Sequence, residues 1–163
     1  MQKLVLIFLF CSLICAAIAN ALPYPIEVCS HNGDTAKVIK GPDGKVLPDD
    51  APIFVIRSHY LKHEIPKPGA GVSENEFVIQ KEKINPTKNM AGELSFLITA
   101  ADYDEFLQPA QAIKGEKVYF RVFDTTDTTF PSGTLYADTE FYEISTTFGS
   151  IQNVHFGEWK KIH

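Results

Sequence analysis

Two histidines four residues apart, His59 and His63, are the first candidates for metal chemistry in this chain. On a helix, this spacing places two imidazoles on one face, where they can bind one zinc ion. The surrounding residues are rich in β-branched and aromatic types, which favours a strand. On a strand the two positions lie about 13 Å apart, because each residue advances the chain by about 3.3 Å. We therefore interpret both histidines as surface residues and expect no zinc site.

A second candidate pair is Cys29 and His31, a thiol two residues from an imidazole. Such a pair acts as nucleophile and base only when the two side chains are within hydrogen-bonding reach. On a strand they share one face at a separation of about 6–7 Å, which is too far. We interpret Cys29 as a small buried hydrophobe. The sequence also lacks a nucleophile elbow, a phosphate-binding loop and a dinucleotide fingerprint, so we expect no enzymatic activity and no cofactor.

Carboxylates gather in two segments, around Asp102 and Asp104 and around Asp124 and Asp127. Calcium binds oxygen-rich loops of this kind. Neither segment follows the EF-hand pattern, whose sixth position is Gly, because the sixth residue from Asp102 is Leu107. Aspartates and threonines also form turns without a metal. Calcium binding at these four aspartates and simple turn formation are therefore two open interpretations.

Four aromatic residues lie in or beside turn-rich segments, namely Tyr103, Phe106, Phe130 and Tyr136. Exposed ring faces at the rim of a domain can stack on sugar rings or on a partner protein. The alternative is that these rings close the end of the hydrophobic core, as aromatic side chains commonly do in a small domain. We favour the second interpretation and keep the four residues as candidate ligand-binding positions.

The elements that must position these residues are short strands. Strands are predicted where β-branched and aromatic residues alternate or run together, and prolines and glycines bound them. The expected strands are residues 53–65, 77–79, 94–99, 118–122, 141–144 and 154–162. Residues 35–39 and 45–47 are expected to form a hairpin around the turn at 41–44, in which Pro42 presets φ and Gly44 takes a positive φ.

This pattern predicts an all-β fold, an antiparallel β-sandwich of about seven strands. A parallel α/β fold is excluded because no long segment has helical periodicity. The one segment that could form a short helix is residues 100–107.

Two segments resemble known β-sandwich families. Residues 40–55, with Gly-Pro-Asp-Gly followed by Leu-Pro and a strand, are similar to the first hairpin of carboxypeptidase-regulatory-like (transthyretin-like) domains. Residues 113–124, which contain Gly-Glu-Lys-Val-Tyr-Phe-Arg-Val, resemble a strand common in Ig-like domains of secreted and cell-surface bacterial proteins. The resemblance implies a seven-stranded sandwich with a scaffold or adhesion role and no catalytic residues.

The N-terminus is typical of a signal peptide. Lys3 precedes an apolar run from Leu4 to Ile18, and small residues follow at the positions that a signal peptidase reads. The run is shorter than the roughly 20 apolar residues that span a bilayer, so we do not expect a membrane anchor. We predict that residues 1–21 are removed and that residues 22–163 form one domain, which is secreted, periplasmic or held at the cell surface. Cys29 is then the only remaining cysteine.

The composition limits the partners. The chain has a formal net charge of −5 and no basic stripe, so nucleic acid is not an expected partner. Three functions stay open. The first is a non-catalytic exported protein with a scaffold, cell-envelope or adhesion role, whose partner is an unknown protein or glycan. The second is a carbohydrate-binding module that uses loop aromatics, and the third is a small secreted hydrolase, which requires a concave pocket with converging titratable groups.

Overall fold

The structure is a computed structural model, and it describes residues 26–29, 31–32, 35–36, 38–58, 60–84, 92–93, 95–98, 117–143 and 151–163. The described residues form strands, turns and loops, without an α-helix. This confirms the all-β prediction for that part of the chain. Within it, no helix has the length and apolar character needed to cross a bilayer. The predicted signal peptide at residues 1–21, the possible helix at 100–107 and His59 lie outside the described residues.

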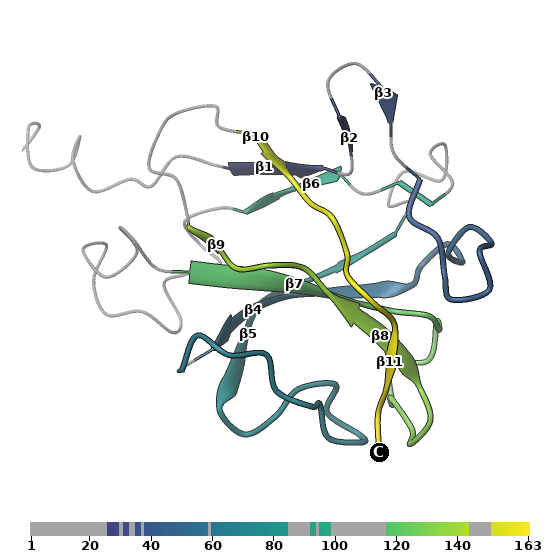
Figure 1. Cartoon of the computed structure of the whole chain (residues 1–163), viewed down its shortest axis with the longest axis vertical. Helices are drawn as coiled ribbons and strands as arrows, with labels where there is room; N and C mark the ends of the chain where they lie inside the picture. Colours follow the sequence, from purple (N-terminus) through teal and green to yellow (C-terminus); the bar gives the residue numbers. More distant parts are fainter. Residues whose placement is uncertain are drawn as a thin grey trace, which may run out of the picture.

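The main element is an antiparallel sheet of six strands. Its strands are β4 (Pro52–Ser58), β5 (Glu76–Lys83), β7 (Lys117–Phe123), β8 (Leu135–Asp138), β9 (Tyr142–Glu143) and β11 (Lys160–Lys161). The order across the sheet is β11-β8-β7-β4-β5, and β9 pairs with the beginning of β7. The long strands β4 and β7 therefore lie at the centre, as Figure 1 shows.

A separate sheet of three strands has the order β10-β1-β6 and lies above the first sheet in Figure 1. It consists of β1 (Ile26–Cys29), β6 (Ser95–Ile98) and β10 (Ile151–Asn153). The pair β1–β6 is antiparallel, whereas β1 and β10 are parallel. A parallel pair requires a long connection, and the chain that forms the other sheet lies between these two strands. Two short strands, β2 (His31–Asn32) and β3 (Thr35–Ala36), form a hairpin beside this sheet.

Both faces of the central strands are buried, which explains why these segments are apolar throughout. Side chains alternate between the two faces of a strand. On β7, Val118, Phe120 and Val122 join one hydrophobic cluster, and Tyr119 and Phe123 join a second one on the opposite face. The second cluster is closed by side chains from connecting loops, Val72, Phe130 and Phe141.

The predicted strand at 53–65 is wrong at its C-terminal end, because β4 stops at Ser58. The Ser58 hydroxyl donates to the Lys62 carbonyl at 2.8 Å and accepts from the Lys62 amide at 3.3 Å. These bonds close a turn in which Leu61 has a φ of 51°. The predicted strand at 154–162 is likewise reduced to β11 and an isolated bridge between Thr139 and Phe156.

The predicted turn at 41–44 is confirmed. The Gly44 amide donates to the Gly41 carbonyl at 3.0 Å, and Gly44 has a φ of 78°. The Asp43 carboxylate accepts from the Lys45 amide at 2.9 Å. Lys40 and Val46 pair across this turn as a single bridge, so the expected hairpin is shorter than its sequence suggests.

Candidate functional site

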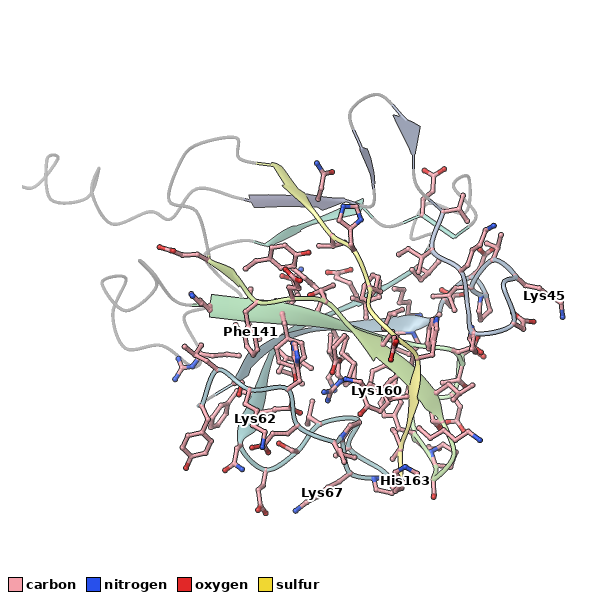
Figure 2. The ribbon with its side chains drawn as sticks, viewed as in Figure 1. Lys45, Lys62, Lys67, Phe141, Lys160 and His163 are labelled. Atoms are coloured by element: carbon pink, nitrogen blue, oxygen red, sulfur yellow. The ribbon has the colours of Figure 1, made fainter. Side chains whose placement is uncertain are left out.

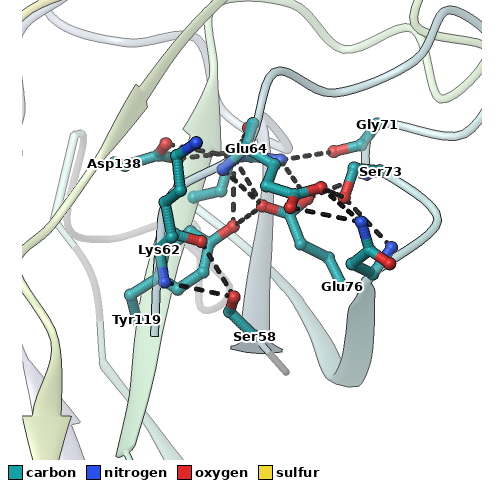
Figure 3. Close-up of polar contacts among 10 residues, drawn as sticks. Ser58, Lys62, Glu64, Gly71, Ser73, Glu76, Tyr119 and Asp138 are labelled. Atoms are coloured by element: carbon teal, nitrogen blue, oxygen red, sulfur yellow. Dashed lines mark hydrogen bonds and ion pairs between the residues drawn. The ribbon is translucent and has the colours of Figure 1, made fainter. Parts of the chain in front are cut away.

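Three buried charged side chains meet on one face of the six-stranded sheet. Arg121 on β7 is fully buried, and it lies between Glu76 on β5 and Asp138 on β8. The Arg121 Nε and Nη2 atoms donate to the two oxygens of Asp138 at 2.7 and 3.0 Å. Nη1 donates to Glu76 Oε2 at 2.9 Å. Figure 3 shows these contacts, which we call the Arg121 network.

The same network fastens the loop between β4 and β5 to the sheet. Arg121 also donates to the carbonyl oxygens of Glu64 and Gly71, at 2.8 and 3.2 Å. The Glu76 carboxylate accepts from the backbone amides of Glu64 and Ser73, at 3.1 and 2.8 Å. Each buried charge is therefore hydrogen-bonded, which is the condition under which an ion pair is tolerated in a protein interior.

Tyr119 completes the Arg121 network, since its hydroxyl donates to Glu76 Oε1. Burial raises the pKa of Tyr119 far above its ordinary value, and the nearby carboxylates of Asp138 and Glu76 act in the same direction. Burial opposes the charge on Arg121, but the hydrogen bond and negative charge of Asp138 outweigh it and raise the pKa of Arg121. Arg121 therefore stays charged and Tyr119 stays neutral. Because neither group changes its protonation state, the hydrogen bonds between them and the carboxylates stay in place and form a rigid frame.

Asp138 also forms part of the wall of a cavity of about 480 Å³, which we call the larger cavity. This volume lies within the range of about 300–1,000 Å³ that is usual for small-molecule sites. The Asp138 carboxylate itself is 3% exposed and bound to Arg121. The other charged residues of the wall are Glu140, Glu158 and Lys160. Lys160 is labelled in Figure 2 on the C-terminal segment, where this segment passes in front of the sheet. The larger cavity thus brings together residues from three segments of the chain, at His63, 138–142 and 155–160.

Aromatic and imidazole rings form the rest of the wall, from Tyr142, Phe156, His63 and His155. The Tyr142 hydroxyl accepts a hydrogen bond from the His155 amide at 3.4 Å. Burial raises the pKa of Tyr142, so its phenol keeps its proton. The cavity therefore offers ring faces together with hydrogen-bond donors and acceptors.

Backbone contacts fix the floor of the larger cavity. The Gly157 amide donates to the Asp138 carbonyl at 2.8 Å, and Thr139 pairs with Phe156. The Thr139 hydroxyl accepts from the Phe120 amide at 3.0 Å. A side chain at residue 157 would place its Cβ 3.3 Å from the Asp138 carbonyl oxygen, so glycine permits this close approach.

His63 reaches the larger cavity from the loop that the Arg121 network holds. Its ring stacks on Phe141 with centroids 4.7 Å apart and meets the edge of Tyr119 at 4.7 Å. The Nε2 atom is buried and makes no hydrogen bond with the described residues. His63 thus connects the loop between β4 and β5 to the larger cavity.

A smaller cavity of about 170 Å³ lies on the other side of the C-terminal segment. Its wall includes Val38, Ile39 and the half-buried Trp159, whose indole donates to the Lys40 carbonyl at 3.2 Å. Residues 155–157 line both cavities. The C-terminal segment, which runs from β10 to β11 in Figure 1, therefore separates two neighbouring hollows.

Two of the four predicted aromatic positions are described, and both are buried. Phe130 is 3% exposed and Tyr136 is 2% exposed. Phe130 packs edge-on against Phe54, and Tyr136 lies under the Arg121 guanidinium at 4.8 Å. Their burial favours the alternative that they close the core, and it leaves them no ring face for a ligand. The other two positions, Tyr103 and Phe106, lie outside the described residues.

The described aspartates of the predicted calcium site are Asp124 and Asp127. Asp127 accepts from the amide and hydroxyl of Thr129 at 2.8 and 2.7 Å, and these hydrogen bonds lower the pKa of Asp127. The pKa of Asp124 is raised by burial and by the charge of Asp43. Within the described residues no three or more His, Cys, Asp or Glu side chains form a group suited to a metal ion. Asp102 and Asp104 lie outside those residues.

Of the residues that line the larger cavity, only His63 stands out in the sequence, and the expectation that it lies on the surface is wrong for its buried Nε2 atom. Tyr142 lies in the predicted strand 141–144, with Glu140 directly before it, and Phe156 and Glu158 lie in the predicted strand 154–162. The available signal was the mixture of acidic and aromatic residues in these two segments, including the only tryptophan of the chain. Comparisons with protein-family models, with curated proteins and with solved structures found no match.

Proposed function

We propose that the chain is an exported, non-catalytic β-domain that binds a ligand in the larger cavity. The observation that carries this proposal is the coupling of Asp138, in the cavity wall, to the buried Arg121. A wall residue held by charged hydrogen bonds keeps its position before a ligand arrives, which lowers the entropic cost of binding. A scaffold or adhesion role at the cell envelope is compatible with such a site.

The proposed export rests on the signal-peptide pattern at residues 1–21. Fractionation of the native host followed by N-terminal sequencing tests it. A mature chain that begins at residue 22 outside the cytoplasm supports export, and an unprocessed cytoplasmic chain contradicts it. Nucleic acid is not a proposed partner, because the chain has a formal net charge of −5 and no basic stripe.

A sandwich of the two sheets is part of the proposal. Its support is the burial of both faces of β4 and β7, together with the separation of the two sheets in Figure 1. The Ig-like or transthyretin-like type is a further proposal that rests on the resemblance of residues 40–55 and 113–124.

Carbohydrate is the ligand class that we propose as the more specific alternative to a protein partner. The wall combines ring faces from Tyr142 and Phe156 with carboxylates from Glu140 and Glu158. Rings stack on the apolar faces of sugars, and carboxylates accept hydrogen bonds from hydroxyl groups. The ring positions differ from the loop aromatics that the sequence suggested.

The test is a binding panel of glycans and host-envelope proteins with the mature domain. Tyr142→Ala and Glu140→Gln should each weaken binding, whereas Phe77→Ala, at a 44% exposed ring away from the cavity wall, should not. Binding that is unchanged in both Tyr142→Ala and Glu140→Gln would overturn the proposed site. Binding that EDTA abolishes and calcium restores would instead implicate the predicted calcium aspartates, including Asp124 and Asp127.

A small hydrolase is a third candidate, because titratable groups do converge on this cavity. The same glycans are therefore examined for cleavage products. Turnover that Glu140→Gln or Glu158→Gln abolishes would overturn the non-catalytic proposal.

A further inference from the structure

We infer that residues 155–161 act as a strap across the edge of the six-stranded sheet, and that Trp159 is the latch that holds this strap closed. When the strap detaches, the larger cavity loses one part of its wall while the rest of the sheet stays folded. The inference goes beyond the proposed function, because it concerns the movement of the wall and applies to any ligand.

The strap is anchored at both ends, on opposite faces of the sheet. Val154, directly before it, is buried in the cluster that contains Phe120. Ile162, directly after it, is buried in the cluster on the other face. The Ile162 amide donates to the Thr134 carbonyl at 2.9 Å, and its carbonyl accepts from the Gly133 amide at 2.8 Å. The strap therefore crosses from one face to the other at β8, where β11 forms the edge of the sheet in Figure 1.

Between these anchors the strap has little buried surface. The side chains of Phe156 and Trp159 are half-buried, and the other five positions of the strap are exposed. A segment with few buried apolar contacts and exposed backbone hydrogen bonds opens at a lower free energy than core strands do. Gly157 favours the detached state further, since glycine gains the most conformational freedom on release. We therefore expect the strap to open before the sheet unfolds.

Trp159 joins the strap to a distant part of the chain. Its indole Nε1 donates to the carbonyl of Lys40, which lies 119 residues earlier in the sequence, at 3.2 Å. The same ring packs against the cluster that contains Val154. The other contacts of the strap with the sheet include the bond from the Gly157 amide to the Asp138 carbonyl and the short pairing of β11 with β8. Trp159 is therefore a positioning residue, which acts on the cavity through the strap.

The strap supplies one part of the wall of the larger cavity, with His155, Phe156, Gly157, Glu158 and Lys160. The remaining part comes from the sheet and from His63, whose loop the Arg121 network holds. One part of the wall is thus fixed and the other can move. Detachment of the strap opens the cavity to a ligand, and its return brings both parts of the wall against that ligand.

Hydrogen exchange of residues 22–163 tests the strap without a ligand. The amides of Gly157 and Thr139 are a matched pair, since they donate to backbone carbonyls at 2.8 and 2.9 Å, one from the strap and one from the sheet. The protection factor of Gly157 should be at least about 10-fold lower than that of Thr139. Trp159 is the only tryptophan of the chain, so its fluorescence should change at a lower urea concentration than the circular dichroism of the sheet.

Two variants separate the strap from the sheet. Ile56→Val removes a methyl group from a buried position of β4, and it should lower the protection of Thr139 by about 2- to 10-fold. It should leave Gly157 unchanged, because this contact persists when the strap is open. Trp159→Phe keeps a ring and removes the indole donor. It should lower the protection of both amides by about 2- to 10-fold, since both openings start from the closed state.

Equal protection of Gly157 and Thr139 in the unaltered protein, or an equal loss at both amides in Ile56→Val, would overturn the strap. Unchanged protection of Gly157 in Trp159→Phe would overturn the latch. The first two measurements leave the strap intact, so they decide the question even if the variant at residue 159 fails to fold. A glycan panel without binding would contradict the proposed function and leave the strap, whereas coincident urea transitions would contradict the strap and leave the proposed site.

Discussion

Arg121 and Asp138 face each other on neighbouring strands, where they are paired in register and joined by two hydrogen bonds of 2.7 and 3.0 Å. This contact connects the buried interior of the sheet to the wall of the larger cavity. Through Glu76, the same arginine holds the loop that carries His63. The stability of the fold and the shape of the candidate site therefore depend on one side chain.

Arg121→Met should destabilise the protein by about 3–5 kcal/mol, because it leaves the carboxylates of Glu76 and Asp138 buried without a partner. Chemical denaturation measures this change. The control is Lys67→Met, which removes the exposed ion pair with Glu74 and should cost less than about 1 kcal/mol. Equal losses in the two variants would show that the Arg121 network does not hold the fold.

Hydrogen exchange provides a second measure of the same variant. The amides of Glu64 and Ser73 donate to Glu76, whose carboxylate Arg121 orients. In Arg121→Met these amides should exchange faster than the amides at the centre of β4. Unchanged protection of Glu64 and Ser73 would contradict the role of Arg121 in fixing this loop.

Gly71→Ala should be more destabilising than Gly133→Ala, although both glycines have positive φ, of 72° and 92°. A Cβ at residue 71 would lie 2.9 Å from the Phe130 ring and 3.0 Å from the Phe54 ring, whereas residue 133 has open space. The backbone conformation costs about 1–2 kcal/mol at either position, and overpacking adds about 1–3 kcal/mol at residue 71. Thermal melts that rank the two variants equally would contradict the packing around Gly71.

Stability should fall at alkaline pH because burial raises the pKa of both Tyr119 and Tyr136. A raised pKa means that the folded state holds the phenol proton more tightly than the unfolded state does. The stabilisation is complete below the ordinary value of 10.0 and is lost as the pH rises above it. The expected slope is up to about 1.4 kcal/mol per pH unit for each tyrosine.

Denaturation curves between pH 9 and pH 11.5 test this expectation. Tyr119→Phe should reduce the slope, and the same change at the exposed Tyr60 is the matched control. Absorbance of tyrosinate in the native protein should show buried phenols that ionise only on unfolding. Full ionisation of all tyrosines without unfolding would contradict their burial.

Cys29 should react slowly with a thiol reagent in the folded protein and rapidly after denaturation. Cys29 lies in β1, the central strand of the three-stranded sheet, where it pairs with Ser95 on β6 and with Asn153 on β10. Rapid labelling of the native domain, or a covalent dimer on a non-reducing gel, would contradict this prediction.

The sequence predicts the apolar strands β4 and β7 because local composition is sufficient for them, whereas it identifies only residues 77–79 of β5, whose last four residues are polar. Residues 118–122 alternate between two hydrophobic faces, and the structure places them in β7. It does not predict β8, because Leu135–Asp138 is nearly all buried and therefore shows no alternation of apolar and polar residues. β4 ends at Ser58 because the Ser58 side chain closes a turn with Lys62, and the composition of the segment does not reveal this turn.

The candidate site is harder to predict because its parts are far apart in the chain. Arg121 lies 45 residues from Glu76 and 17 from Asp138, and nothing local distinguishes it from a surface arginine. The larger cavity forms only when the C-terminal segment returns to pair with β8 through Lys160 and Lys161. Local patterns therefore predict strands, whereas the site depends on the way distant strands are paired.

The most direct test of the proposed site is an NMR titration of ¹⁵N-labelled residues 22–163 with the oligosaccharides of the glycan panel. We predict that the largest amide shifts fall in residues 138–142 and 155–160, at the wall of the larger cavity, and that Tyr142→Ala reduces them. Leu61 and Phe77, which are exposed elsewhere, should stay unchanged. Shifts centred on those exposed residues, or no shifts at millimolar ligand, would contradict glycan binding in the larger cavity.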